Sequence, residues 1–326
     1  MKRLARFIQD GAIASAVVAI ALGATAQAAD KSIVAIYKSG TQQYFIDQAK
    51  GFTDAAKALG YSAKTINVEL NANQAISAIS DAIASGAKGI ALTAPDQAIG
   101  PAAAKAAADA KVPLVATDDS LKDGAGKAVP FVGFDGTDMG NKVGQKAGEL
   151  LKASGWLKGA KYGILTVELQ TLSVCNDRTN AEKAQLTAAG AAAANIIPVA
   201  YDGTTNSSLS AAGPVITAHP DVNKWVVVSC NDEGTLGALN ALTTAGFKPD
   251  DMIVVGLGAY EACHPWAAGT PSGFKAALYI SGVDVGDAAA KALIATIETG
   301  KPLPEKTVAA TSIVDASNYK DKMKCQ

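Results

Sequence analysis

The sequence has few of the residues on which metal sites and many enzymes depend. It contains two histidines, His219 and His264, and four cysteines, and their spacing fits no zinc-binding pattern. It also has no nucleophile elbow, no phosphate-binding loop, no dinucleotide fingerprint and no zinc-protease motif. His219 ends a predicted helix, where a cation is favourable, so we expect a structural role for it. The sequence therefore predicts no metal site, no cofactor and no catalytic residues.

The chain also lacks a surplus of charge of either sign. Its formal net charge is −1 over 326 residues, with no basic stripe that would neutralise phosphates, so we expect no nucleic-acid partner. Hydrophobic residues make up 49% and charged residues 18% of the sequence, which is typical of a globular protein rather than a disordered one. The length exceeds what one compact core usually holds and predicts two domains.

Residues 1–28 have the pattern of a signal peptide. Three basic residues among the first six precede an apolar run from Ala12 to Leu22, and Ala26-Gln27-Ala28 fits cleavage near Ala28. An uncleaved membrane anchor is the alternative, but the apolar run is shorter than the ~20 residues of a spanning helix. We therefore expect an exported, soluble protein.

Export changes the expected state of the four cysteines. An even number of cysteines in an oxidising compartment predicts one or two disulfides, and four cysteines can pair in three ways. The sequence does not choose among these pairings. The residues are Cys175, Cys230, Cys263 and Cys325.

From Lys31 onward, short apolar segments alternate with amphipathic ones. Ser32 to Tyr37 and Ser62 to Val68 are predicted strands, and Gln42 to Leu59 is a predicted helix between them. The pattern breaks near Gly133 to Gly136 and then begins again. Strands that alternate with helices at this spacing predict right-handed βαβ units. We therefore predict an α/β fold of two doubly wound parallel-sheet lobes with a cleft between them.

Polar side chains lie near the ends of several predicted strands. The clearest case is Asn231-Asp232, which directly follows the apolar run from Trp225 to Ser229 and precedes a predicted helix. Ligand crevices of open α/β sheets lie at the carboxyl ends of strands, so we expect such side chains to line one site. The candidate ligand-binding residues are Lys38, Gln42, Tyr44, Asp118, Asp119, Arg178, Asn206, Asn231 and Asp232.

This set combines carboxylates, amides, a guanidinium and an aromatic ring, which is the chemistry that a sugar requires. Sugar hydroxyls donate and accept, planar groups hold adjacent hydroxyls in pairs, and C–H faces pack on rings. Structural roles remain open for some members. Asp118 or Asp119 could cap a turn, and Asn206 could cap a helix. Arg178 could form a surface ion pair with Glu182.

Two long segments of the sequence are distinctive: GAKGIALTAPDQAIGPAAAKAAADAKVPLVATDD (Gly86 to Asp119) and HPDVNKWVVVSCNDEGTLGALNALTTAGFKPDDMIVVGLG (His219 to Gly258). They resemble the periplasmic sugar-binding proteins of ABC transporters, in the ribose- and arabinose-type group, with the arabinose type nearer. The resemblance extends over essentially the whole mature chain.

The resemblance implies a type I periplasmic-binding-protein fold with a three-stranded hinge. Residues 29–134 plus 260–310 would form the N-terminal lobe, and residues 135–259 plus 311–326 the C-terminal lobe. The chain would cross between the lobes near Gly133 to Gly136, Leu257 to Tyr260 and Ala310 to Ser312.

The resemblance also assigns roles to the candidate residues. Lys38 stands where the arabinose type has a lysine that bonds ring and hydroxyl oxygens, and Arg178 where it has a clamp arginine. Gln42 replaces a glutamate and Tyr44 a stacking tryptophan, while three of the four cysteines do not fit the family pattern. The remaining matches are an acidic pair, two amides and the acidic residue of an Asn-Asp pair: Asp118, Asp119, Asn206, Asn231 and Asp232.

The function implied is that of a periplasmic binding protein that closes by hinge bending around one monosaccharide, an arabinose-like pentose or a hexose. It would deliver this sugar to the membrane permease subunits of an ABC importer, and a chemoreceptor is a further partner to consider. Alternatives are the same fold binding a polyol or another small polar ligand, or acting as a periplasmic sensor. A transcriptional regulator would need a helix-turn-helix where this chain has a signal peptide, and an exported enzyme would need a nucleophile or metal cluster.

Overall fold

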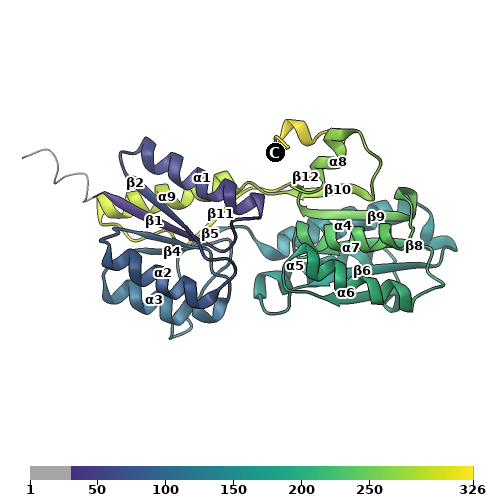
Figure 1. Ribbon diagram of the computed structural model, residues 1–326, viewed down its shortest axis with the longest axis horizontal. Helices are drawn as coiled ribbons and strands as arrows, with labels where there is room; N and C mark the ends of the chain where they lie inside the picture. The colour runs from purple at the N-terminus through teal and green to yellow at the C-terminus, as the bar shows by residue number, and fades with distance from the viewer. Residues whose placement is uncertain (1–30, 326) are drawn as a thin grey trace, which may run out of the picture.

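The computed structural model describes residues 31–325 and shows two α/β lobes side by side (Figure 1). Each lobe is built on one six-stranded sheet with helices on both faces. The predicted signal peptide lies outside the described residues. Within them, no helix has the length and apolar character needed to cross a bilayer.

In the first lobe all the strands run parallel. Their order across the sheet is β11 (Lys306–Val308), β5 (Phe131–Gly133), β4 (Leu114–Thr117), β3 (Ile90–Leu92), β1 (Ser32–Tyr37) and β2 (Ser62–Asn67). The helices of this lobe are α1 (Gln43–Ala58), α2 (Ala72–Ala84), α3 (Gly100–Asp109) and α9 (Gly282–Thr299).

The second lobe repeats this plan, except that its edge strand pairs antiparallel with its neighbour. The order is β12 (Ser312–Val314), β10 (Phe274–Tyr279), β9 (Met252–Gly258), β8 (Lys224–Ser229), β6 (Tyr162–Glu168) and β7 (Ile196–Ala200). The helices are α4 (Gly136–Ala153), α5 (Ser173–Ala188), α6 (Thr205–Ala218), α7 (Asp232–Thr244) and α8 (Cys263–Ala268). The predicted class of two doubly wound parallel sheets is confirmed.

The chain crosses between the lobes three times: after β5, after β10, and between β11 and β12. The second crossing corrects the domain boundaries expected from the sequence. It lies between Tyr279 and Gly282 rather than at Leu257 to Tyr260. β10 pairs in parallel with β9, with Tyr279 opposite Gly258, and this pairing keeps residues 263–279 in the second lobe.

Glycines spaced four residues apart on α4 allow α5 to lie against it at very short range. A Cβ atom on Gly140 would lie 2.1 Å from the carbonyl oxygen of Arg178, and one on Gly144 would lie 2.7 Å from the Cα atom of Glu182. Because these neighbours are backbone atoms, no side-chain movement could make room. Gly136 and Gly148 of α4 also lie close to this segment, where an added Cβ atom would lie 3.1 Å from the carbonyl oxygen of Val174 and 2.6 Å from the Cβ atom of Ala189.

Both possible disulfides are formed, and their pairing is one of the three that the sequence left open. Cys175 bonds to Cys230 and Cys263 to Cys325, at sequence separations of 55 and 62 residues. The chain-entropy model assigns about 4 kcal/mol of stabilisation to loops of either length. The two disulfides are therefore expected to contribute almost equally to stability, although they lie in different parts of the second lobe.

Candidate functional site

A cavity of about 160 Å³ lies between the two lobes at the carboxyl ends of the central strands. Its volume corresponds to on the order of ten water-sized groups, which is the scale of a small organic molecule. Both lobes supply its walls, as expected for this class of fold. The sequence-predicted residues that line the cavity are Lys38, Gln42, Tyr44, Asp118, Asp119, Arg178, Asn231 and Asp232.

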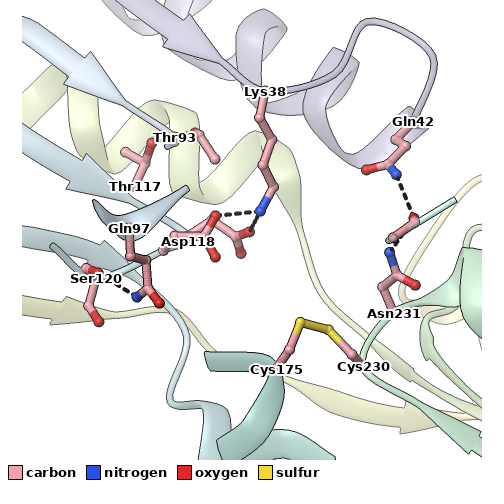
Figure 2. A network of polar contacts seen from close by, with 12 residues as sticks. Lys38, Gln42, Thr93, Gln97, Thr117, Asp118, Ser120, Cys175, Cys230 and Asn231 are labelled. Atoms are coloured by element: carbon pink, nitrogen blue, oxygen red, sulfur yellow. Dashed lines mark hydrogen bonds and ion pairs between the residues drawn. A yellow bond between two sulfur atoms is a disulfide. The ribbon is translucent and has the colours of Figure 1, made fainter. Parts of the chain in front are cut away.

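The first lobe contributes a buried cluster of one lysine and two carboxylates. The ammonium of Lys38 donates a hydrogen bond to Oδ2 of Asp119 and lies 3.8 Å from Oδ2 of Asp118. Asp118 has a φ of 60°, a left-handed conformation that Asp tolerates better than most residues and that often marks functional positions. Burial raises the pKa of the Asp119 carboxyl, and the charge of Lys38 offsets part of this rise. Figure 2 shows Lys38 pointing toward Asp118.

Arg178 faces this cluster from the second lobe. Its Nη1 atom donates to the carbonyl oxygen of Cys230 at 3.0 Å, and its Nη2 atom lies 3.8 Å from Oδ1 of Asp118. The alternative of a surface ion pair with Glu182 is wrong, because both side chains are buried. Since the Asp118 contact joins the two lobes, Arg178 links the halves of the cavity.

Asn231 and Gln42 belong to opposite lobes and both donate a hydrogen bond to the backbone carbonyl oxygen of Gly203. Asn231 is the N-cap of α7, where its Oδ1 accepts from the backbone of Gly234 at 2.9 Å and from the hydroxyl of Tyr201 at 2.6 Å. Its Nδ2 donates to the carbonyl oxygen of Gly203 at 3.2 Å, and Nε2 of Gln42 donates to the same oxygen at 3.4 Å (Figure 2). Both amides therefore shape the cavity wall, and the hydrogen bond from Gln42 joins the lobes across it.

Asp232 begins α7 and lies at the floor of the cavity, 4% exposed. Its Oδ2 accepts from the backbone N–H of Glu261 at 3.1 Å, whereas its Oδ1 has no hydrogen-bond partner among the described residues. Burial raises the pKa of its carboxyl to about 7. Near neutral pH the group can therefore offer a ligand either a donor or an acceptor.

The raised pKa of Asp232 predicts a stability that falls as pH rises. The folded state holds the proton up to about pH 7, whereas the carboxyl has a pKa of 3.8 when unperturbed. Between these values the folded protein binds more protons, so its free energy of unfolding decreases by up to about 1.4 kcal/mol per pH unit. Asp232→Asn should make this decline shallower in thermal unfolding of the ligand-free protein between pH 4.5 and 8, while the raised pKa values of the Glu182 and Glu233 carboxyls keep part of it.

Asp81→Asn, which replaces an exposed residue on α2, is the control. Its free energy of unfolding should depend on pH as in the wild type. If the free energy of unfolding depended on pH equally in the wild type and in Asp232→Asn, the raised pKa of Asp232 would be contradicted.

Tyr44 brings an aromatic ring and a hydroxyl to the cavity from the first turn of α1. The ring packs against Phe45 and Tyr260, with centroid distances of 4.9 and 6.3 Å. Its hydroxyl has no hydrogen-bond partner within residues 31–325, and burial raises its pKa well above the usual value. The phenol therefore stays protonated and can donate to a ligand.

Asn206 does not reach the cavity, which corrects the sequence-based assignment. It is an exposed residue in the first turn of α6. Thr204 is the N-cap of this helix, because its side chain accepts from the backbone of Ser207. The turn before the helix faces the cavity instead, through Asp202 and Gly203.

The sequence reasoning missed an apolar wall on the second lobe. Leu169, Leu172 and the Cys175–Cys230 disulfide pack together and line the cavity. A signal for this wall was present, because Cys175 lies three residues before Arg178 and Cys230 directly precedes Asn231. Tyr260, Glu233 and Glu261 also line the cavity without having been selected.

Contacts across the cavity show the lobes held together. In addition to the pairs made by Gln42 and Arg178, Oε1 of Gln97 accepts a hydrogen bond from the backbone N–H of Ser173 at 2.7 Å. Gln97 belongs to the first lobe and Ser173 to the start of α5 in the second. The described conformation is therefore a closed one.

Comparison with known proteins identifies the family. Residues 33–302 match the family model described as a periplasmic binding protein domain. The chain belongs to the periplasmic binding protein family. This periplasmic binding protein is 32% identical over 305 residues to the ABC transporter L-arabinose-binding periplasmic protein of Azospirillum brasilense, an alignment that covers 91% of this chain and 90% of the relative.

Two further similarities agree with this family. The protein is 27% identical over 279 residues to the L-arabinose-binding periplasmic protein of Escherichia coli K12, with 82% of each chain covered. The myo-inositol binding protein of Caulobacter, solved with myo-inositol bound, has a TM-score of 0.75 at 20% sequence identity, over 90% of this chain and 95% of that one. The structural likeness shows a shared fold.

Proposed function

We propose that this protein is the sugar-binding component of an ABC importer and that it closes around one monosaccharide, a pentose or a hexose. The main support is a set of buried polar atoms that belong to cavity-lining residues and have no hydrogen-bond partner among the described residues. Leaving such a group unpaired costs about 1–3 kcal/mol, so a ligand rich in hydroxyls is favoured. The atoms are Tyr44 Oη, Asp118 Oδ1, Asp119 Oδ1, Arg178 Nε and Nη2, and Asp232 Oδ1.

The charge of the lining favours a neutral ligand over an anionic one. Two cationic side chains, Lys38 and Arg178, face six carboxyl groups in the cavity wall. A phosphorylated sugar or a sugar acid would add negative charge to a buried, acidic site at a large desolvation cost. The carboxyl groups are those of Asp118, Asp119, Asp202, Asp232, Glu233 and Glu261.

The hinge and the cross-lobe contacts support a role in delivery to a transporter. Three chain segments join the lobes, and such a hinge allows rigid-body closure because a few residues absorb the changes in backbone angles. In the closed form the two lobes present one combined surface. We propose that the membrane permease subunits recognise this surface in the periplasm and thereby distinguish loaded from empty protein.

Isothermal titration of the purified protein against a panel of small polyhydroxylated compounds tests the proposal. The panel would contain L-arabinose, D-ribose, D-galactose, D-allose and myo-inositol. Binding should be saturable and should stabilise the protein by about 2.7 kcal/mol at a ligand concentration 100 times the dissociation constant. Binding of myo-inositol alone would support the polyol alternative. No heat and no thermal shift with any compound would contradict the sugar hypothesis.

The same samples test the proposal that binding occurs without chemistry. The named relatives are binding proteins, and none of the enzyme motifs sought in the sequence is present. After prolonged incubation with the protein, the bound compound should be recovered unchanged by NMR. A new product that depends on the protein concentration would instead indicate an enzyme.

A further inference from the structure

The Cys175–Cys230 disulfide lies in the wall of the ligand cavity, at the point where two chain segments meet (Figure 2). Cys175 belongs to the first turn of α5, and Cys230 lies between the end of β8 and the N-cap of α7. The two side chains are only 3% and 2% exposed, and their Cα atoms are 4.9 Å apart. The bond therefore fixes the start of α5 against the β8–α7 junction.

Arg178 belongs to one of these two segments and forms a hydrogen bond to the other. It follows Cys175 by three residues, which places both side chains on one face of α5. Its Nη1 atom donates to the carbonyl oxygen of Cys230, the partner of Cys175 in the disulfide. A shift of the first turn of α5 relative to Cys230 would therefore change where the guanidinium points.

The first turn of α5 has no capping side chain from its own lobe, although it packs against Gly136 of α4. Its N-cap residue, Leu172, makes no side-chain capping bond, and no acidic residue lies in the first turn. Uncapped helix starts leave backbone N–H groups unsatisfied and are weakened accordingly. The side-chain acceptor that does reach Ser173 is Gln97 of the opposite lobe, so this cap is lost when the lobes separate. The disulfide remains in both conformations.

We propose that the Cys175–Cys230 disulfide is a positioning element of the binding site, which holds Arg178 in its ligand-competent orientation in the open protein before closure. This role is separate from the general stabilisation that any disulfide provides. The expected effect of this disulfide on ligand affinity rests on the proposed sugar-binding function, whereas its effect on Arg178 can be measured without a ligand.

The second disulfide is a matched control. Cys263 and Cys325 join α8 to the C-terminal segment, and neither residue lines the cavity. Their sequence separation of 62 residues is close to the 55 residues of the first disulfide, so the loss of chain-entropy stabilisation should be similar for both. Cys175→Ala/Cys230→Ala and Cys263→Ala/Cys325→Ala are the variants to compare, since alanine adds no unpaired hydroxyl to buried sites.

Arg178 can be observed directly because it is the only arginine after Arg6. In protein produced from residue 29 onward and labelled with ¹⁵N-arginine, the Nε–Hε spectrum should contain a single side-chain resonance. Without ligand, that resonance should move or broaden in Cys175→Ala/Cys230→Ala and should stay at its wild-type position in Cys263→Ala/Cys325→Ala. If the first variant does not fold, Cys263→Ala/Cys325→Ala measured with and without dithiothreitol under native conditions replaces it, because Cys175–Cys230 is then the disulfide left to reduce.

Isothermal titration with the tightest-binding sugar of the panel gives the second readout. Affinity should fall about 10- to 100-fold in Cys175→Ala/Cys230→Ala, the scale expected for a misplaced binding group, and by less than about twofold in the control. An unchanged Arg178 resonance in the first variant, or equal losses of affinity in both variants, would overturn the proposal. If no sugar binds the wild type, the sugar hypothesis fails, and the resonance comparison alone decides the positioning role.

Discussion

Replacing Arg178 with alanine should weaken ligand binding severely while the protein remains folded. Two of its nitrogen atoms, Nε and Nη2, are buried in the cavity without a hydrogen-bond partner in the described chain, and Nη2 lies 3.8 Å from Asp118 of the other lobe. A planar guanidinium can hold two adjacent hydroxyls at once. Removing one partner of a buried, charged contact costs about 2–5 kcal/mol, a loss of roughly 30- to 4,000-fold in affinity.

Titration of Arg178→Ala and Arg178→Lys with the same sugar separates charge from geometry. Lysine keeps the positive charge but loses the planar fork, so its affinity should lie between those of the wild type and the alanine variant. Lys50→Ala removes an exposed cation on α1 that pairs with Asp54 outside the cavity, and should bind like the wild type. Retention of wild-type affinity by Arg178→Ala, with normal circular dichroism, would place Arg178 outside the ligand site.

Gly140→Ala should destabilise the protein by about 3 kcal/mol, near the upper end of the cost of overpacking. The new methyl group would lie 2.1 Å from the carbonyl oxygen of Arg178 and 2.8 Å from the Cβ atom of Ala181, so α5 has to move away from α4. Urea unfolding measures the loss as a lower midpoint. The ligand affinity of the folded fraction should fall as well, because α5 carries Arg178.

Gly213→Ala is the matched control for Gly140→Ala. Gly213 also lies inside a helix, α6, where a Cβ atom would have no neighbour within 4 Å beyond the backbone of its own helix and the adjacent residues, one of which is Pro214. Its replacement should change stability by less than about 1 kcal/mol, because the gain from restricting the unfolded chain is opposed by crowding between a Cβ atom and the following proline ring in a helix. If both substitutions changed the unfolding midpoint in the same direction and by a similar amount, the close contact between α4 and α5 would be refuted.

The alternation of strands and helices could be predicted from the sequence because it depends on local periodicity. The site was largely predictable for a related reason, since polar residues such as Asp118 and Asn231 stand out where apolar strands end. Parallel strands then bring those ends to one edge of each sheet. The local pattern and the fold class together were sufficient to predict most of the polar residues that line the cavity.

The features that were missed depend on long-range pairing or on single-residue boundaries. The crossing after β10 was misplaced because β10 joins β9 through the six-residue helix α8, and sequence periodicity does not reveal which sheet a strand enters. Asn206 was misplaced because Thr204 and Asn206 are both good N-cap residues, and the helix begins after the first of them. The disulfide pairing required the folded chain, since no local pattern distinguishes the three possibilities.

The hydrogen bonds to the carbonyl group of Gly203 affect how far the protein closes when no ligand is bound. Gln42 and Asn231 both donate to it from opposite lobes, so part of the attraction that closes the protein exists without cargo. Each 1.4 kcal/mol of such attraction multiplies the closed, empty population tenfold. Empty protein in that shape would compete with loaded protein for the permease and provoke futile ATP turnover. We infer that the contact between Gln42 and Gly203 raises the closed fraction of the empty protein, which spin-label distances between the lobes of wild-type and Gln42→Ala protein would measure; an unchanged closed fraction would refute the idea.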